Sequence, residues 1–168
     1  GNTTGAGTGY DFSKLASEQK VIVITINYRL GPFGWFYHPS LIETSSSKED
    51  KSWDYGLLDQ ILALNWVKNN IEQFGGNPDN VTIFGESAGG HNVFSLISSK
   101  LAKGLFHRAI SQSGSTRTTS IEDASNYVDD EKNPGWPTSS REIVNNLLLT
   151  SNDVKDLYEA KILQESMN

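Results

Sequence analysis

The residues best suited to chemistry form a short turn, GESAG, at residues 85–89 with Ser87 at its centre. A Gly-x-Ser-x-Gly pattern is weak by itself, because small residues gather in many turns. Here a β-branched run at residues 81–84 directly precedes the turn, and an amphipathic stretch directly follows it. A strand–turn–helix setting places a serine on a strained turn with its hydroxyl exposed, as a nucleophile needs. The alternative is a structural serine that caps the following helix.

Three neighbours of Ser87 have expected roles if it is a nucleophile. Gly85 and Gly89, together with the additional Gly90, are expected to be small because the strand and the helix approach each other closely there. The backbone N–H of Ala88 lies at the start of the predicted helix. It is therefore expected to face the oxyanion that develops during attack on a carbonyl.

Strand and helix patterns alternate around this turn. Buried strands are predicted at residues 20–27, 81–84 and 108–112, the first of them β-branched and apolar almost throughout. Helices are predicted at residues 10–16, 55–74 and 139–149, with others after the turn and at residues 152–160, whereas residues 39–51 and 115–136 are predicted to be irregular. Alternation of this kind favours an α/β fold with central parallel strands and flanking helices.

Composition excludes several classes of function. The 168-residue chain has 14 Lys and Arg against 20 Asp and Glu, a net charge of −6, and no basic cluster, so nucleic-acid binding is not expected. With no cysteine, it has no disulfide, thiolate metal site or cysteine nucleophile. The longest apolar run, at residues 21–26, is far too short for a membrane span, which needs about 20 residues. No metal and no cofactor is expected.

Four segments together resemble the type-B carboxylesterases, the carboxylesterase/cholinesterase family. Residues 74–89 resemble the family's active-site serine signature, and residues 27–34, 56–60 and 106–114 resemble three further family segments in order and spacing. Residues 34–39 and 90–92 are most similar to bacterial members. The resemblance covers roughly residues 1–150.

This resemblance implies an α/β-hydrolase fold and hydrolysis of small-molecule carboxylic esters through an acyl-enzyme on Ser87. It gives Ala88 one oxyanion-hole N–H. It also implies that Glu86 and Ser113 belong to a buried polar network beside the catalytic histidine. Arg29 and Asp59 match a buried ion pair, for which loss of one partner costs about 3–5 kcal/mol.

The resemblance further implies that residues 1–168 are a partial α/β-hydrolase domain, truncated at both ends. The triad order of this fold is Ser, then Asp or Glu, then His. In the family both partners lie well over a hundred residues past the serine, whereas this chain continues for 168 − 87 = 81 residues. The glycine-rich oxyanion loop is expected before Gly1. His38, His91 and His107 are not expected to replace the missing base, so the isolated chain is expected to be inactive.

Two further readings stay open at the level of sequence. A noncatalytic binding or adhesion relative is the alternative function, although such relatives have typically lost the serine that this chain retains. Trp136 and the other aromatic residues of the loops either line an acyl pocket or pack structurally.

The acidic residues between 122 and 131 are expected to form a solvated surface, because their spacing fits no calcium loop.

Overall fold

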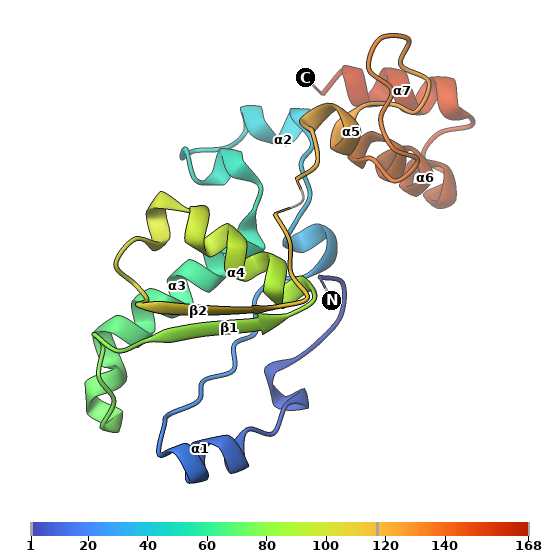
Figure 1. Ribbon diagram of the computed structural model, residues 1–168. Helices are drawn as coiled ribbons and strands as arrows, with labels where there is room; N and C mark the ends of the chain where they lie inside the picture. The colour runs from blue at the N-terminus through green and yellow to red at the C-terminus, as the bar shows by residue number, and fades with distance from the viewer. Residues whose placement is uncertain (1, 117, 168) are drawn as a thin grey trace. The chain divides into compact units, whose positions relative to one another are not determined.

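The computed structural model describes residues 2–116 and 118–167 (Figure 1). The chain divides into two compact units, each built from two segments. The first unit comprises Gly1–Trp35 and Tyr55–Arg117, and the second comprises Phe36–Asp54 and Thr118–Asn168.

The centre of the first unit is a pair of parallel strands, β1 (Thr82–Glu86) and β2 (Arg108–Gln112). In their register, Thr82 lies opposite Arg108 and Glu86 opposite Gln112. Helix α4 (Ala88–Ser98) connects the two strands and packs on both. Figure 1 shows α3 (Tyr55–Asn70) on the same side of the strands as α4, and α1 (Ser13–Gln19) on the other side. Short 3₁₀ turns complete the unit at Gly7–Gly9, Gly31–Phe33, Ile71–Phe74 and Lys100–Ala102.

The core of this unit lies between β1 and the two helices α3 and α4. Its members are the apolar residues Ile61, Leu64, Ile83, Val93, Leu96, Ala102 and Leu105. The predicted strands at 81–84 and 108–112 are confirmed to within two residues, and the predicted helix at 55–74 is α3 with a final 3₁₀ turn. Leu64 and Leu96 are buried, whereas Leu62 and Ile97 of the same two helices are exposed.

The strand predicted at residues 20–27 is wrong for this structure. The segment belongs to no β-ladder, and its side chains Val21, Ile22, Ile24 and Ile26 remain 37–47% exposed. A strand requires a neighbour whose N–H and C=O groups pair with its own. Among the described residues, β1 pairs only with β2, and a cavity of about 320 Å³ separates residues 22–25 from Trp66, Ile71 and Phe74.

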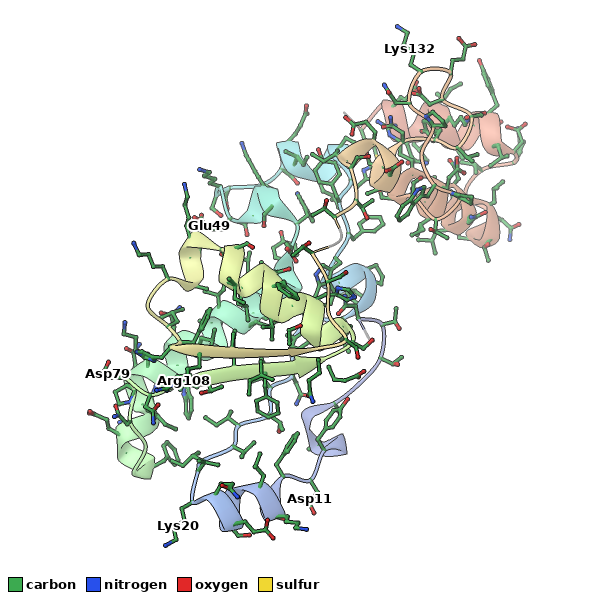
Figure 2. All side chains as sticks on the ribbon, in the orientation of Figure 1. Asp11, Lys20, Glu49, Asp79, Arg108 and Lys132 are labelled. Carbon is green, nitrogen blue, oxygen red and sulfur yellow. The ribbon has the colours of Figure 1, made fainter. Side chains whose placement is uncertain are left out.

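Helix α1 begins three residues later than predicted, at Ser13. The Asp11 carboxylate accepts a hydrogen bond from the Ser13 N–H at 2.9 Å. Hydrogen bonding by the Ser13 side chain, and secondly by this N–H, lowers the pKa of Asp11. In Figure 2, Asp11 and Lys20 project outward near the two ends of this helix. In the part of the chain that the structure describes, no helix has the length and apolarity to cross a bilayer.

The second unit is helical, with α2 (Pro39–Glu43), α5 (Ile121–Ser125), α6 (Ser140–Ser151), α7 (Leu157–Glu165) and a 3₁₀ turn at Asp50–Ser52. The expectation of irregular structure at residues 39–51 and 115–136 is therefore wrong for α2 and α5. Helix α7 starts later than the predicted residue 152, because Asp156 caps it by accepting from the Glu159 N–H.

Residues 139–142, with the sequence SSRE, have the pattern of a capping box at the start of α6, but only the half made by Ser139 is formed among the described residues. The Ser139 hydroxyl accepts from the Glu142 N–H. The Glu142 carboxylate does not return to Ser139; it accepts from the Val128 N–H at 2.9 Å and from the Asn145 side chain at 3.2 Å. Glu142 therefore ties the preceding loop to α6 instead of closing the cap.

A chain of buried polar side chains lies at the centre of the second unit. His38 is 3% exposed, and its Nε2 lies 3.0 Å from Oε1 of Gln164, which is fully buried. The Gln164 Nε2 donates to Asn145 Oδ1 at 2.7 Å and to the Arg141 carbonyl at 3.1 Å. Because both amide hydrogens of Gln164 are used, its Oε1 accepts, and His38 must carry a hydrogen on Nε2.

This burial makes the second unit sensitive to acid. Burial lowers the pKa of His38 from its usual 6.5, the Gln164 hydrogen bond opposes that shift, and the charge of Arg141 adds to it. The unfolded chain therefore binds a proton first as the pH falls, so His38 contributes stability that is present above pH 6.5 and lost below it.

His38→Gln is expected to weaken this acid sensitivity, because glutamine retains an N–H donor but does not titrate. In urea unfolding of the full-length gene product, the wild type should lose more free energy of unfolding between pH 7.5 and 5 than the variant. One group contributes at most about 1.4 kcal/mol per pH unit. Identical pH dependence in both proteins contradicts the prediction.

Candidate functional site

Ser87 occupies the junction between the end of β1 and the start of α4 (Figure 1). Its backbone angles are φ 54° and ψ −114°, in a region that only glycine enters readily. Holding a serine there costs about 1–3 kcal/mol, which surrounding contacts must offset. Two of these contacts are backbone hydrogen bonds: Ser87 N–H donates to the Gln112 carbonyl at 2.9 Å, and His91 N–H donates to the Ser87 carbonyl at 3.0 Å.

The Ser87 side chain does not cap α4. It makes no cap hydrogen bond, and an ordinary capping residue has extended backbone angles, as Ser120, Ser139 and Asp156 have here. The side chain is exposed. The reading of Ser87 as a capping serine is therefore wrong, and a strained serine with an accessible hydroxyl is what a nucleophile requires.

The glycines of the turn are not equivalent. A Cβ on Gly85 would lie 2.4 Å from the Gly89 carbonyl oxygen, and a Cβ on Gly90 would lie 2.7 Å from the Gln112 carbonyl oxygen. Gly85 and Gly90 are therefore required by the close approach of the strands to the helix. The expectation that close approach also requires a glycine at position 89 is wrong, since a Cβ on Gly89 would meet no heavy atom within 4 Å among the described residues.

Ala88 is the first residue of α4, so its N–H is one of the helix-terminal amides that point out of the helix N-terminus. Glu86 is the last residue of β1, opposite Gln112 in the register, and Ser113 directly follows the end of β2. Both are exposed, in contrast to the burial that the family resemblance implies, because no described residue covers them. Ser113 shares with Ser87 a backbone φ of 54°.

Arg29 and Asp59 form a bidentate ion pair that joins the segment before α2 to helix α3. The Arg29 side chain donates from Nε and from a terminal nitrogen, at 2.9 and 2.8 Å, and its backbone N–H donates to the same carboxylate at 2.9 Å. The Arg29 guanidinium also lies 4.5 Å from the centre of the Tyr55 ring. The expectation of burial is wrong: the side chains of Arg29 and Asp59 are 49% and 24% exposed.

The bonds from Arg29 lower the pKa of the Asp59 carboxyl, its side-chain bond most of all, while partial burial opposes the shift. The pair therefore adds stability above the usual value of 3.8, and this stability is lost as the pH falls through the lowered pKa. Asp59→Asn is expected to cost about 1–2 kcal/mol of unfolding free energy at pH 7, less than a buried pair would lose.

Urea unfolding of the full-length gene product at pH 7 and pH 3 checks this, and the difference should shrink at pH 3. The control is Glu18→Gln, which breaks the Lys14–Glu18 surface pair at 3.9 Å, where the side chains are 84% and 57% exposed. It should leave the unfolding midpoint unchanged. An equal effect of both substitutions contradicts the assignment.

Comparison with known proteins decides the family. A sequence model described as the carboxylesterase family matches residues 1–164. The chain belongs to the carboxylesterase family. A para-nitrobenzyl esterase of Bacillus subtilis is 53% identical over 122 residues, which cover 71% of this chain and 24% of that protein. Carboxylesterase 1D of Rattus norvegicus is 48% identical over 121 residues, 72% of this chain and 20% of the relative.

Solved structures agree with this assignment. A thermophilic PNB esterase superposes with a TM-score of 0.67 and 40% identity, over 96% of this chain and 29% of that one. Carboxylesterase EST55 of Geobacillus stearothermophilus gives 0.56 and 44%, over 64% and 22%. The resemblance and the α/β-hydrolase fold predicted from sequence are confirmed. The chain spans about a quarter of the length of the curated relatives it matches.

The three histidines of this carboxylesterase chain are engaged away from the Ser87 hydroxyl. His107 Nδ1 accepts from the Val81 N–H at 3.2 Å, and His38 binds Gln164 in the second unit. His91 lies in α4 itself, and its Nδ1 contacts Ser115. Among the described residues, no ring nitrogen of the three has a hydrogen bond to the Ser87 hydroxyl; the bond from His91 to Ser87 joins their backbones.

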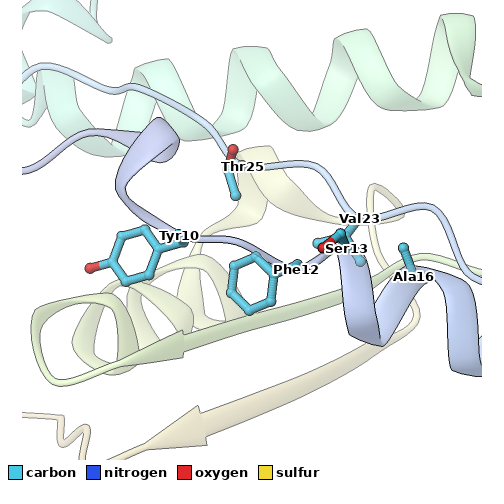
Figure 3. A pocket seen from close by; sticks show the side chains of 6 residues that line it. All are labelled: Tyr10, Phe12, Ser13, Ala16, Val23 and Thr25. Atoms are coloured by element: carbon cyan, nitrogen blue, oxygen red, sulfur yellow. The ribbon is translucent and has the colours of Figure 1, made fainter.

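The two cavities of about 210 and 320 Å³ in the first unit have no residue of the Ser87 turn in their lining. One of about 210 Å³ is bounded by Tyr10, Phe12, Ser13, Ala16, Val23 and Thr25, as Figure 3 shows. It lies between α1 and the extended segment, where Phe12 also meets Phe84 edge to face at 5.5 Å. The cavity is lined by both apolar groups and hydroxyl-bearing side chains, and Tyr10 is the titratable residue in its lining. It offers no catalytic group for ester hydrolysis.

Sequence reasoning missed three contacts that hold the turn. Gly114 lies so close to Gly90 that a Cβ on it would be 2.4 Å from the Gly90 carbonyl carbon. Asn92 donates to the Tyr28 hydroxyl at 3.2 Å, and His91 contacts Ser115. The paired small residues GG and SG, at 89–90 and 113–114, were a usable signal for the first contact. No sequence signal pointed to the other two.

Proposed function

We propose that the full-length gene product hydrolyses carboxylic esters through an acyl-enzyme formed on Ser87. The observation that supports it is that Ser87 has a backbone φ of 54° and is exposed, and that its hydroxyl does not cap α4, in a chain of the carboxylesterase family. Strain is retained at a position where glycine would fit more easily, which indicates that the hydroxyl is needed there.

In the proposed mechanism, Ser87 Oγ attacks the ester carbonyl carbon and its proton passes to a base. The alkoxide of the tetrahedral intermediate faces the Ala88 N–H at the positive end of α4. In the collapse, the C–O bond to the leaving oxygen breaks, the base returns the proton to that oxygen, and the alcohol leaves an acyl ester on Ser87. Water then cleaves this ester, releasing the carboxylic acid and regenerating the serine. Glu86 supplies negative charge beside the base, and Ser113 hydrogen-bonds in the same network.

Residues 1–168 are proposed to be one part of a single α/β-hydrolase domain. The match of the family model to residues 1–164, across both compact units, supports this. The base, its carboxylate partner and the glycine-rich oxyanion loop are proposed to come from residues outside this stretch. Because the relatives include a para-nitrobenzyl esterase, small esters of that type are the substrates to try first.

Covalent labelling tests the proposal directly. The full-length gene product is incubated with a fluorophosphonate, or with a slowly hydrolysed ester quenched in the burst phase, and the modified peptide is identified by mass spectrometry. The expected adduct lies on Ser87, with turnover of a p-nitrophenyl ester in parallel. A fully folded protein with turnover but an adduct elsewhere, or with neither turnover nor adduct, overturns the proposal. The 168-residue chain alone is expected to label slowly and to show no turnover.

A further inference from the structure

His91 links the carboxyl ends of the two strands. Its backbone N–H binds the Ser87 carbonyl, directly after β1. Its ring atom Nδ1 lies 3.0 Å from the backbone nitrogen of Ser115, 2.9 Å from the Ser115 carbonyl oxygen and 3.3 Å from the Ser115 hydroxyl, three residues after β2. A single residue of α4 therefore contacts both segments that leave the sheet at this edge.

The ring contact holds in either neutral tautomer of His91. With its hydrogen on Nε2, the ring accepts at Nδ1 from the Ser115 N–H; with its hydrogen on Nδ1, it donates to the Ser115 carbonyl. Because one partner residue presents both a donor and an acceptor to the same atom, the link does not depend on the tautomer. An apolar side chain at this position offers neither interaction.

The segment that His91 holds is the one beside the strained serine. Ser87 N–H donates to the Gln112 carbonyl, so Ser113 lies next to the turn in the strand register. Ser113 itself has φ 54°, and Gly114 then packs tightly on Gly90. Residues 113–115 fold back over the first turn of α4. The Gly90–Gly114 approach and the His91–Ser115 bonds are among the contacts that hold this fold-back in place.

We propose that His91 is a positioning residue for the Ser87 nucleophile: it holds residues 113–115 against the start of α4 and so fixes the geometry of the turn. The inference rests on the proposed esterase function. His91 does not act as the base in this role, because the contacts of its ring are to Ser115, and neither ring nitrogen has a hydrogen bond to the Ser87 hydroxyl among the described residues. A displacement of about 1 Å in such a site can lower the rate by about 10²-fold.

Three substitutions in the full-length gene product separate positioning from mere packing. His91→Asn keeps a polar amide near the position of Nδ1, His91→Gln carries its amide farther out, and His91→Leu keeps bulk without a polar atom. His91→Leu is expected to lower kcat about 10- to 100-fold with KM nearly unchanged. His91→Asn should restore most of that loss, and His91→Gln should not.

Hydrogen exchange gives a readout that does not depend on activity. The amides of residues 113–116 should exchange faster in His91→Leu and His91→Gln than in the wild type and His91→Asn. Wild-type kcat in His91→Leu, or equal impairment in His91→Asn and His91→Gln, overturns the inference. If Ser87 is not the nucleophile, the fluorophosphonate adduct lies on another residue or does not form, yet the exchange pattern still shows whether His91 holds the segment. If His91→Leu does not fold, the comparison of the two amide variants decides.

Discussion

Ser87→Ala is expected to lower kcat for p-nitrophenyl esters by at least about 10⁴-fold in the full-length gene product, to a level set by the remaining site. The reason is chemical: without Oγ no acyl-enzyme forms, while the Ala88 N–H and the fold remain. Steady-state kinetics with a fluorophosphonate titration of the active fraction measures this loss. The control is Ser98→Ala, which removes an exposed hydroxyl from the other end of α4 and should leave kcat and KM unchanged.

Ser87→Gly separates the chemical role of this residue from its conformational cost. Glycine also lacks the nucleophile, but it adopts φ 54° without a Cβ penalty. Activity should therefore be lost in both variants, whereas only Ser87→Gly should raise the unfolding free energy, by about 1 kcal/mol or more over Ser87→Ala. Equal stability of the two variants would show that the backbone at residue 87 is not strained. Substantial turnover by either variant argues against an acyl-enzyme on Ser87.

The turn was predictable from sequence because its signals are local. A β-branched run, a pair of flanking small residues and an apolar helical face all lie within residues 81–97. Strands β1 and β2, and the helix between them, follow from such short-range patterns. The Arg29–Asp59 pair came from the family resemblance, since 30 residues separate its members in the chain.

The wrong predictions depend on partners that are distant in sequence. Residues 20–27 have the composition of a strand, but pairing depends on a neighbour, and no described strand lies beside them in the ladder. The exposure of Glu86 and Ser113 has the same cause, since what covers a strand end is not encoded next to it. The His38–Gln164 contact joins residues 126 apart, and no periodic pattern signals it.

Gly85→Ala is expected to disrupt the turn, whereas Gly89→Ala, the same added methyl group four residues later, is expected to be tolerated. At Gly85 the new Cβ would lie 2.4 Å from the Gly89 carbonyl oxygen and 2.5 Å from its carbon, and both are backbone atoms that cannot rotate away. The end of β1 and the first turn of α4 must then move apart, which displaces Ser87. Overpacking of this kind costs about 1–3 kcal/mol.

Gly89 is the second residue of α4 and has open space around its Cα among the described residues. Alanine there reduces the entropy lost on helix formation, so stability should be unchanged or raised by up to about 1 kcal/mol. Thermal and urea unfolding of both variants, with fluorophosphonate labelling rates for Gly85→Ala, measures the contrast. We expect Gly85→Ala to unfold at a lower temperature and to label about 10²-fold more slowly, because the displaced hydroxyl no longer meets the reagent in line. If both alanine variants are equally stable, the close approach of β1 and α4 does not constrain this turn, and the strain at Ser87 must be maintained by the Gln112 and His91 backbone bonds alone.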